Sequence, residues 1–253
     1  MAAYKRNRRQ NAFMSGNREN DKTLHANLEF TAIEQYKLVR ANLDFTLPEG
    51  EKCPVIGVTS SMKGEGKSTT SVNLSYVFAE KGSKVLLIDA DMRLPSLAKK
   101  LDIENSPGLA DLLRGSDVQL SQFKSHLLSN WFILPAGDVP PNPSELLGSS
   151  RMKNLLNQLR EIFDYIIIDL PPVNIVSDAI SISRLITGMI VVIREEHTDK
   201  RELDRCFRQL KLSNVNVLGC VMNQAKTNGG IYKKSRGYAN YDSKQDVYGE
   251  NAK

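Results

Sequence analysis

The chain has 253 residues, of which 41% are hydrophobic and 25% are charged, with a formal net charge of +5. These proportions are those of a globular protein long enough to bury a sizeable core, which excludes a largely disordered or fibrous chain. No apolar run approaches the roughly 18 residues of a membrane-spanning helix, and the basic N-terminus lacks the apolar stretch of a secretory signal.

The positive charge is concentrated at the two ends of the chain. Residues 1–30 hold six Lys and Arg against three Asp and Glu, and residues 225–253 hold the same numbers, so each end carries +3 and the remainder −1. Because the excess does not mark a structured face, we expect no nucleic-acid partner. The basic N-terminal arm (1–30) is either solvated chain or a segment that contacts acidic lipid or a partner. The globular domain is expected over 31–224.

Short apolar, β-branched runs recur along the domain and predict buried strands, with stretches of helical spacing between them. The strands are expected at 55–59, 85–88, 131–134, 165–168, 189–193 and 215–222. The helices are expected at 68–80, 143–161, 178–185 and 199–210. Strands that alternate with helices predict an α/β fold, a mostly parallel twisted sheet with helices on both faces.

The sharpest motif lies between the first strand and the first helix. It runs SMKGEGKST from Ser61 to Thr69 and fits the phosphate-binding pattern G-x-x-x-x-G-K-[ST], with serine in place of the first glycine. The two glycines let successive backbone N–H groups converge on phosphate oxygens, and the helix N-terminus adds partial positive charge. The strand before the motif and the helix after it argue against a chance glycine-rich turn. The candidate nucleotide-binding residues here are Lys63, Gly64, Glu65, Gly66, Lys67, Ser68 and Thr69.

Two strands end in carboxylates. Asp89 and Asp91 follow the second strand, and Asp169 ends the fourth. Because carboxyl ends of parallel strands face the crevice where such sheets bind ligands, we expect these groups beside a triphosphate. There they would hold Mg²⁺, directly or through water, or orient a nucleophile. A single aspartate at the end of a strand is readily explained as a helix cap or a loop residue. Three aspartates at such positions beside a phosphate loop are not.

Four segments of the chain carry a family resemblance. The strings TSSMKGEGKSTTSVNLS (59–75), KVLLIDADMRLP (84–95), DVPPNPSELLGS (138–149) and YIIIDLPP (165–172) resemble the phosphate loop, acidic motifs and a further segment of bacterial protein-tyrosine kinases of capsule and exopolysaccharide systems. The resemblance implies a MinD/ParA-like P-loop fold and a site for ATP and Mg²⁺. It also implies that Asn223, at the end of the last strand, forms hydrogen bonds with the edge of the adenine base. The alternative is that Asn223 belongs to a turn at the end of the strand and has no ligand.

We hypothesise the following roles in the site, although the sequence does not separate the roles of the three aspartates. Lys67 and Ser68 hold the β- and γ-phosphates and Mg²⁺, and Thr69 contacts the α-phosphate. Asp89 is the candidate base nearest to Mg²⁺ and the tyrosine hydroxyl, while Asp91 and Asp169 complete the metal shell, mostly through water. Most of the acceleration is expected from positioning and charge neutralisation.

Two positions depart from related patterns. MinD-type ATPases carry a signature lysine at the second position of the phosphate loop, where this chain has Met62, and Lys63 stands one residue later. The second departure is in a segment similar to the family's E-x-x-R-x-x-R-x-N assembly helix, here about 31–45, in which lysine replaces the first arginine and cannot reproduce its bidentate contact. The candidate assembly residues are Glu34, Lys37, Arg40 and Asn42.

The C-terminal tail (225–253) holds half of the chain's eight tyrosines within its last 22 residues. These are Tyr232, Tyr238, Tyr241 and Tyr248. Gly, Ser, Asn, Asp and Lys separate them and no Phe, Trp, Leu or Met accompanies them, so they are not a core stripe. Stacking on single-stranded nucleic acid and the absence of any role are the alternatives. On a phosphoryl-transfer enzyme the tail is best explained as its own substrate, so we predict autophosphorylation between the subunits of a ring.

The resemblance also implies partners and a location. We expect a separate cytoplasmic kinase subunit, which a membrane-embedded activator and chain-length regulator recruits to the inner face of the membrane and a cognate tyrosine phosphatase opposes. The rival classes are a MinD/ParA-like positioning or partitioning ATPase and a regulatory nucleotide-binding module without catalysis. Met62 and the tyrosine tail argue against the first class, and the intact Lys67 with three aspartates argues against the second.

Overall fold

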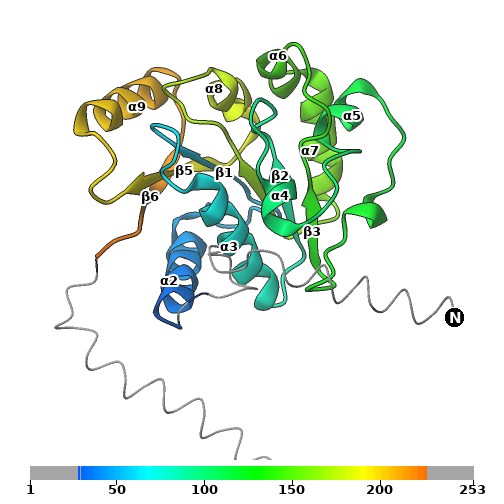
Figure 1. Ribbon diagram of the computed structural model, residues 1–253. Helices are drawn as coiled ribbons and strands as arrows, with labels where there is room; N and C mark the ends of the chain where they lie inside the picture. The colour runs from blue at the N-terminus through cyan, green and yellow to red at the C-terminus, as the bar shows by residue number, and fades with distance from the viewer. Residues whose placement is uncertain (1–27, 29, 227–253) are drawn as a thin grey trace, which may run out of the picture.

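A six-stranded parallel sheet runs through the middle of the molecule (Figure 1). In this computed structural model, residue 28 and residues 30–226 are described. The strands are β1 (Val55–Ser60), β2 (Val85–Asp89), β3 (Trp131–Leu134), β4 (Tyr165–Asp169), β5 (Gly188–Arg194) and β6 (Val217–Asn223). Their order is β3-β2-β4-β1-β5-β6, and every neighbouring pair is parallel. The predicted fold class is confirmed.

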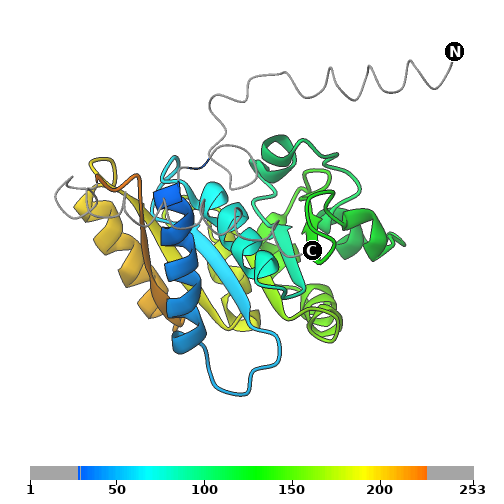
Figure 2. The ribbon, with the colours of Figure 1, turned by 90° about the horizontal axis from the view of Figure 1, so that it is seen from below.

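Helices cover both faces of the sheet, as Figures 1 and 2 show. One face carries α2 (Phe30–Thr46), α3 (Lys67–Glu80) and α4 (Leu97–Leu101). The other carries α5 (Leu109–Arg114), α6 (Pro143–Leu147), α7 (Ser150–Arg160), α8 (Asp178–Ile182) and α9 (Lys200–Leu212). Two short 3₁₀ helices are η2 (Leu120–Phe123) and η3 (Ser183–Leu185).

Alternation along β1 shows how the strand sequences build the two cores. Ile56 and Val58 are buried against the α2–α3 face, whereas Val55 is buried against the opposite face. Gly57 also points to that second face, where a Cβ atom would lie 2.8 Å from Leu170 Cδ1. A strand buried on both sides needs apolar residues at every position, and this is the pattern that made the strands predictable.

Most predicted elements differ from their expected bounds by one or two residues, and three of the differences have a local cause. The helix expected over 143–161 is two helices, because the chain turns at Gly148 and Ser149 starts α7 as an N-cap, its Oγ accepting a hydrogen bond from the Met152 N–H. The helix expected over 178–185 ends as α8 and continues as η3. The last strand begins at Val217, two residues after its predicted start, beyond the positive-φ residue Asn214.

Three short elements between β2 and β3 were not predicted. They are α4, α5 and η2, with four to six residues each. Such lengths span about one turn, too short for a 3.6-residue period to register in the sequence.

The sheet brings the chemically important strand ends together. In the register of the sheet, Asp89 of β2 is paired with Asp169 of β4, and Asp169 is paired with Val58 of β1. The phosphate loop follows β1 directly. The three motifs therefore meet at one carboxyl edge of the sheet, as predicted.

Some expectations fall outside the described residues. These are most of the N-terminal arm and the tyrosine-rich tail beyond residue 226. Within the part of the chain that the structure describes, none of the helices has the length and apolar character needed to cross a membrane.

Candidate active site

The phosphate loop needs glycine at two positions. Gly64 has φ +87° and Gly66 has φ +98°, conformations that L side chains rarely adopt. A Cβ atom on Gly66 would also lie 1.9 Å from Nδ2 of Asn223, so no side chain fits there. The helix α3 begins at the next residue, Lys67, and its first N–H groups therefore face the loop.

Glu65 braces this loop from inside the protein. Only 1% of its surface is exposed. Its carboxylate accepts hydrogen bonds from Ser61 Oγ (2.7 Å), from the Met62 N–H (2.9 Å) and from Thr198 Oγ1 (2.6 Å). The side chain of Glu65 is thus turned away from any nucleotide, and only its backbone can contribute to binding. The serine that replaces the first glycine of the motif donates one of the bracing hydrogen bonds.

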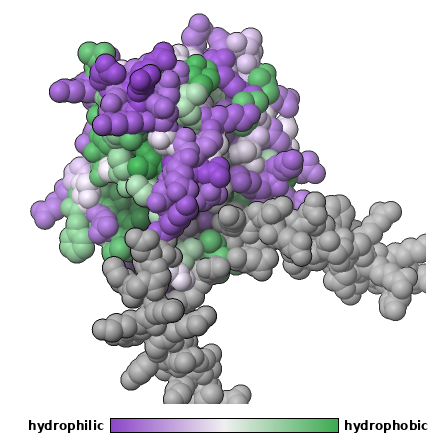
Figure 3. Space-filling model, turned by 60° about the vertical axis from the view of Figure 1, so that its left-hand side comes forward, coloured by the Kyte–Doolittle hydropathy of each residue, from purple (hydrophilic) through white to green (hydrophobic). Residues whose placement is uncertain are grey.

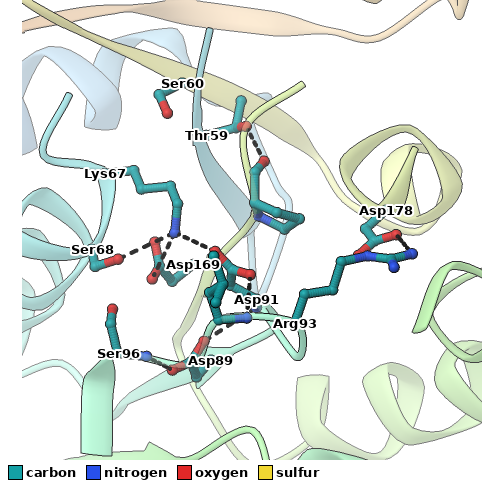
Figure 4. Close-up of polar contacts among 12 residues, drawn as sticks. Thr59, Ser60, Lys67, Ser68, Asp89, Asp91, Arg93, Ser96, Asp169 and Asp178 are labelled. Carbon is teal, nitrogen blue, oxygen red and sulfur yellow. Dashed lines mark hydrogen bonds and ion pairs between the residues drawn. The ribbon is translucent and has the colours of Figure 1, made fainter. Parts of the chain in front are cut away.

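Lys67 joins the phosphate loop to two of the three aspartates (Figure 4). Its Nζ lies 2.8 Å from Asp91 Oδ2 and 3.7 Å from Asp169 Oδ2. It also donates a hydrogen bond to Ser68 Oγ at 3.3 Å. Burial lowers the pKa of Lys67, but the carboxylates of Asp169, Asp91 and Asp89 outweigh burial and raise it above its ordinary value. The lysine is therefore fully charged.

Asp169 offers an oxygen that suits a cation. Its Oδ1 accepts a hydrogen bond from Ser71 Oγ at 3.0 Å, whereas its buried Oδ2 accepts none. Burial raises the pKa of Asp169, although Lys67 and the hydroxyls of Ser68 and Ser71 counteract this. An oxygen donor set of one hydroxyl and one or two carboxylates fits Mg²⁺, which keeps several waters and takes phosphate oxygens as further ligands. Accordingly, no cluster of three or more acidic, His or Cys side chains among the described residues forms a metal cage by itself.

Asp89 is bonded to the backbone of the turn that follows β2. Its Oδ1 accepts a hydrogen bond from the Asp91 N–H (3.1 Å), and its Oδ2 accepts from the N–H groups of Ser96 (3.1 Å) and Leu97 (3.0 Å). Burial and then the charge of Asp169 raise the pKa of Asp89 to about 7. Asp89 thus shapes the turn between β2 and α4, and of the three aspartates it is Asp91 that lines the open pocket.

That pocket has a volume of about 1220 Å³ and extends from the phosphate loop to α2. Lys63, Thr69 and Asn223 line it, as does Tyr36 of α2. Asn223 donates a hydrogen bond from Nδ2 to the carbonyl of Glu65 at 3.0 Å. The expected nucleotide-binding residues are therefore together, with Asn223 bonded to the loop itself.

The sequence did not indicate an ion pair beside the site that joins an exposed arginine to a buried aspartate. Arg93 binds Asp178 with two hydrogen bonds, Nε to Oδ2 at 2.9 Å and a terminal nitrogen to Oδ1 at 3.1 Å (Figure 4). Asp178 is fully buried, and Ser144 Oγ also donates to it. The pair ties the loop that carries Asp91 to α6 and α8. The serine lies in the segment DVPPNPSELLGS, and its partners are 51 and 34 residues away, so no local pattern could indicate the contact.

The candidate assembly residues lie on one helix but are not equivalent. Lys37 and Glu34 form an exposed ion pair at 3.0 Å. Arg40 instead donates a hydrogen bond to the carbonyl of Val77 at 2.7 Å, which fixes α2 to the end of α3.

The side of the molecule with α9, β6 and α2 displays a band of hydrophobic side chains between hydrophilic regions (Figure 3). Leu38 of α2 is 53% exposed.

Known proteins resemble the chain in sequence. The AAA domain family matches residues 53–211. The putative tyrosine-protein kinase CapB of Staphylococcus aureus is 34% identical over 79% of this chain and 88% of its own length. The tyrosine-protein kinase YwqD of Bacillus subtilis is 36% identical over 76% and 81%. CpsD of Streptococcus pneumoniae serotype 4, also a tyrosine-protein kinase, is 38% identical over 78% and 87%.

Solved structures resemble the chain in fold. The chimerical protein CapA2B2 has a TM-score of 0.72 and 32% identity, over 77% of this chain and 85% of that one. The kinase domain of the Escherichia coli tyrosine kinase ETK has a TM-score of 0.70 and 32% identity, over 78% of both chains. The septum site-determining protein MinD of Pyrococcus horikoshii, complexed with Mg-ADP, has a TM-score of 0.56 and 25% identity, over 70% and 72%.

Proposed function

The chain belongs to the bacterial tyrosine-protein kinases, and on that premise we propose that it transfers the terminal phosphoryl group of ATP to tyrosines of its own C-terminal tail. Its relatives are named as tyrosine-protein kinases, and the chain is itself an ATP-dependent enzyme of this class with a P-loop fold. The acceptors in the proposal are Tyr232, Tyr238, Tyr241 and Tyr248. The transfer would run between subunits.

One observation carries the proposal. The Lys67 ammonium lies at the head of the glycine loop and within 4 Å of carboxylates from two different strand ends, Asp91 and Asp169. Three motifs that are up to 102 residues apart in sequence thus converge on one pocket. A lysine, a hydroxyl and carboxylates beside an anion-binding loop are the groups that position a metal-bound triphosphate for transfer.

The mechanism assigns a task to each side chain. Lys67 and the loop N–H groups would hold the β- and γ-phosphates, and Ser68 with Asp169 would hold Mg²⁺, with Asp91 facing the ion through water. When bound, the ion neutralises charge that develops on the phosphoryl oxygens. A tyrosine hydroxyl, with a pKa of about 10, must lose its proton during the transfer. Asp91 lines the pocket whereas Asp89 is held by backbone N–H groups, and this supports Asp91 as the proton acceptor.

The proposal extends to regulation. We infer that subunits assemble through α2, with Glu34, Lys37, Arg40 and Asn42 on the contact, and that each tail enters a neighbour's site. Phosphates add roughly −1.5 to −2 charges each, so phosphorylation of several tyrosines would turn the +3 tail negative, and we infer that this change loosens the ring. A membrane-embedded activator, which brings this cytoplasmic subunit to the inner face of the membrane, and a tyrosine phosphatase would set the cycle. The cycle would control capsule or exopolysaccharide synthesis and export.

Mass spectrometry of the intact chain after incubation with Mg·ATP tests the proposal. The chain is prepared alone and co-expressed with its membrane activator. Mass increments of one phosphate each are expected in at least the second preparation. They should vanish both in Lys67→Met and in a variant with all four tail tyrosines changed to Phe. ATP hydrolysis without increments in both preparations would overturn the kinase proposal and favour the alternative, a MinD/ParA-like positioning ATPase.

Transfer between subunits needs a mixing experiment. A Lys67→Met chain with an intact tail is combined with an active chain that carries Phe at the four tail positions. Phosphate on the Lys67→Met chain is expected, since only the other chain can supply it. If each preparation alone behaves as above but the mixture stays unlabelled, the transfer occurs within one subunit.

A further inference from the structure

A second lysine lies beside the phosphate loop, supplied by α4. Lys100 Nζ donates a hydrogen bond to Thr69 Oγ1 at 3.2 Å. Thr69 is the residue that follows Lys67 and Ser68 at the start of α3. All four side chains line the same pocket. Lys100 thus approaches the pocket from a different element than the loop lysine does.

The charge balance of the pocket sets Lys100 apart. Four cationic side chains line the pocket: Lys63, Lys67, Arg93 and Lys100. Lys67 is paired with Asp91, and Arg93 is paired with the buried Asp178. Neither Lys63 nor Lys100 has an acidic side chain within 4.0 Å in the described part of the chain, and of these two it is Lys100 that donates a hydrogen bond to Thr69. Its charge is therefore available to an anionic ligand.

The direction of the hydrogen bond matters as much as the charge. An ammonium group only donates hydrogen bonds, so Thr69 Oγ1 must be the acceptor. The Thr69 hydroxyl proton then has to point elsewhere. Within the described residues this hydroxyl makes no other hydrogen bond. An anionic oxygen in the pocket is the partner that this polarised hydroxyl fits.

Lys100 is also held in place. Asp89 Oδ2 accepts hydrogen bonds from the N–H groups of Ser96 and Leu97, at the start of α4. The side chain of Leu97 is fully buried against α3 and its neighbours. The short helix that carries Lys100 is thus fixed to the carboxyl end of β2. A cation on a fixed element loses less conformational entropy when it binds a ligand.

We propose that Lys100 and Thr69 form a second phosphate contact, in which Lys100 neutralises the α-phosphate of the nucleotide and orients the Thr69 hydroxyl toward it. Lys67 serves the β- and γ-phosphates. The inference rests on the proposed function only in that the pocket receives ATP, not in which acceptor is phosphorylated. Because ADP and ATP share the α-phosphate, the contact is made equally to both.

Binding of ADP and ATP to the full chain, measured by calorimetry, tests this contact. The variant is Lys100→Met, and the matched control is Lys99→Met, since Lys99 lies on the same helix and is exposed. Loss of one charge-assisted contact should raise the Kd of ADP and that of ATP by the same factor, about five- to tenfold. Lys99→Met should change both by less than about twofold, the effect of an ordinary surface site. Lys100→Arg should recover most of the affinity.

Other outcomes overturn the inference. Unchanged affinity in Lys100→Met would show that the lysine does not contact the nucleotide. A loss for ATP but not for ADP would move Lys100 to the γ-phosphate. If Lys100→Met lowers the Tm without ligand and Lys100→Arg does not recover ADP affinity, the role is structural.

A double variant, Lys100→Met with Thr69→Val, tests whether the two residues act together. The double variant should bind nucleotide only slightly less tightly than whichever single variant has the lower affinity. Additive losses of binding free energy would contradict the shared contact. A wild-type chain that binds nucleotide but labels its tail neither alone nor when co-expressed with the activator would overturn the kinase proposal alone. A wild-type chain that binds neither ADP nor ATP would sink both.

Discussion

The ammonium of Lys67 is ion-paired with Asp91 Oδ2 at 2.8 Å. The side chain expected to hold phosphate is therefore also held by a carboxylate. Both groups are largely buried, with 12% and 7% of their side chains exposed, so water screens the pair only weakly. A nucleotide phosphate would therefore have to displace Asp91 as the partner of Lys67. The released Asp91 carboxylate would then have Mg²⁺ as its partner.

Asp91→Asn should separate nucleotide binding from transfer. Removing the charge frees Lys67 and removes the repulsion between a carboxylate and the phosphates. In EDTA, the Kd of ADP should therefore fall about three- to tenfold, since one interaction with a charged partner is released. With Mg·ATP, phosphate transfer should fall by at least about a hundredfold, because the proposed proton acceptor is lost. Calorimetry in EDTA and intact-mass kinetics measure the two effects.

Asp117→Asn serves as the control for an exposed carboxylate outside the pocket, and it should change neither quantity. If Asp91→Asn instead weakens ADP binding in EDTA, Asp91 orients Lys67 toward phosphate and does not compete for it.

The half-buried ion pair of Arg93 and Asp178 should support the loop that carries Asp91. Arg93→Ala leaves a fully buried carboxylate with Ser144 as its remaining donor. The free energy of unfolding should fall by about 1–3 kcal/mol, less than for a fully buried pair because the arginine side chain is 43% exposed. Adding Asp178→Asn should restore at least half of the loss, because the uncompensated charge is removed. Urea unfolding of the two single variants and the double variant measures the coupling, and additive losses would mean that the pair does not interact energetically.

Local patterns determine how much of the fold is predictable. The six strands are predictable because each is a short apolar run closed by polar residues, and β1, β2 and β4 differ from the expected bounds by only one residue at their ends. The break at Gly148 was missed because the apolar spacing continues from α6 into α7. Whether the chain turns there depends on the Ser149 cap, which the sequence permits but does not require.

In the candidate site, too, local features of the sequence are predictable and contacts between distant residues are not. Gly64, Gly66, Lys67 and the carboxyl-terminal aspartates are predictable, because backbone conformation and strand ends place them. What each carboxylate contacts is not predictable in this way. Glu65 turns inward and Asp89 caps a turn because Thr198 and Ser96, remote or unrecognised in sequence, supply hydrogen-bond donors. Lys100 was missed because α4 is too short to have a recognisable pattern.

Two residues of α2 should separate assembly from stability. Glu34→Ala combined with Lys37→Ala removes an exposed ion pair, which contributes at most about 1 kcal/mol to folding. Light scattering should nevertheless show a smaller assembly, because both side chains are exposed and can contact a neighbouring subunit. Arg40→Ala should cost about 1–2 kcal/mol of unfolding free energy in urea, because the Val77 carbonyl loses a charged donor. An unchanged assembly mass for the Glu34–Lys37 variant would exclude this face of α2 from the contact.

Glu65 should act on nucleotide binding through the shape of the loop. Glu65→Ala leaves three donors without an acceptor: the Ser61 hydroxyl, the Met62 N–H and the Thr198 hydroxyl. The unfolding free energy should fall by about 2–4 kcal/mol, and ADP affinity should fall with it. Glu65→Gln keeps one oxygen, to which both hydroxyls donate, and loses the acceptor for Met62, so its effects should be intermediate.

The comparison of these two variants decides between bracing and direct binding. If Glu65 braces the loop, the loss of ADP affinity should follow the loss of stability across Glu65→Gln and Glu65→Ala. Thr198→Val removes the one donor of the three that lies outside the loop. Its loss of ADP affinity should bear the same relation to its loss of stability. If Glu65→Gln instead abolishes ADP binding while urea unfolding stays at the wild-type value, the carboxylate itself must reach the nucleotide. The inward orientation of Glu65 would then have to reverse when ligand binds.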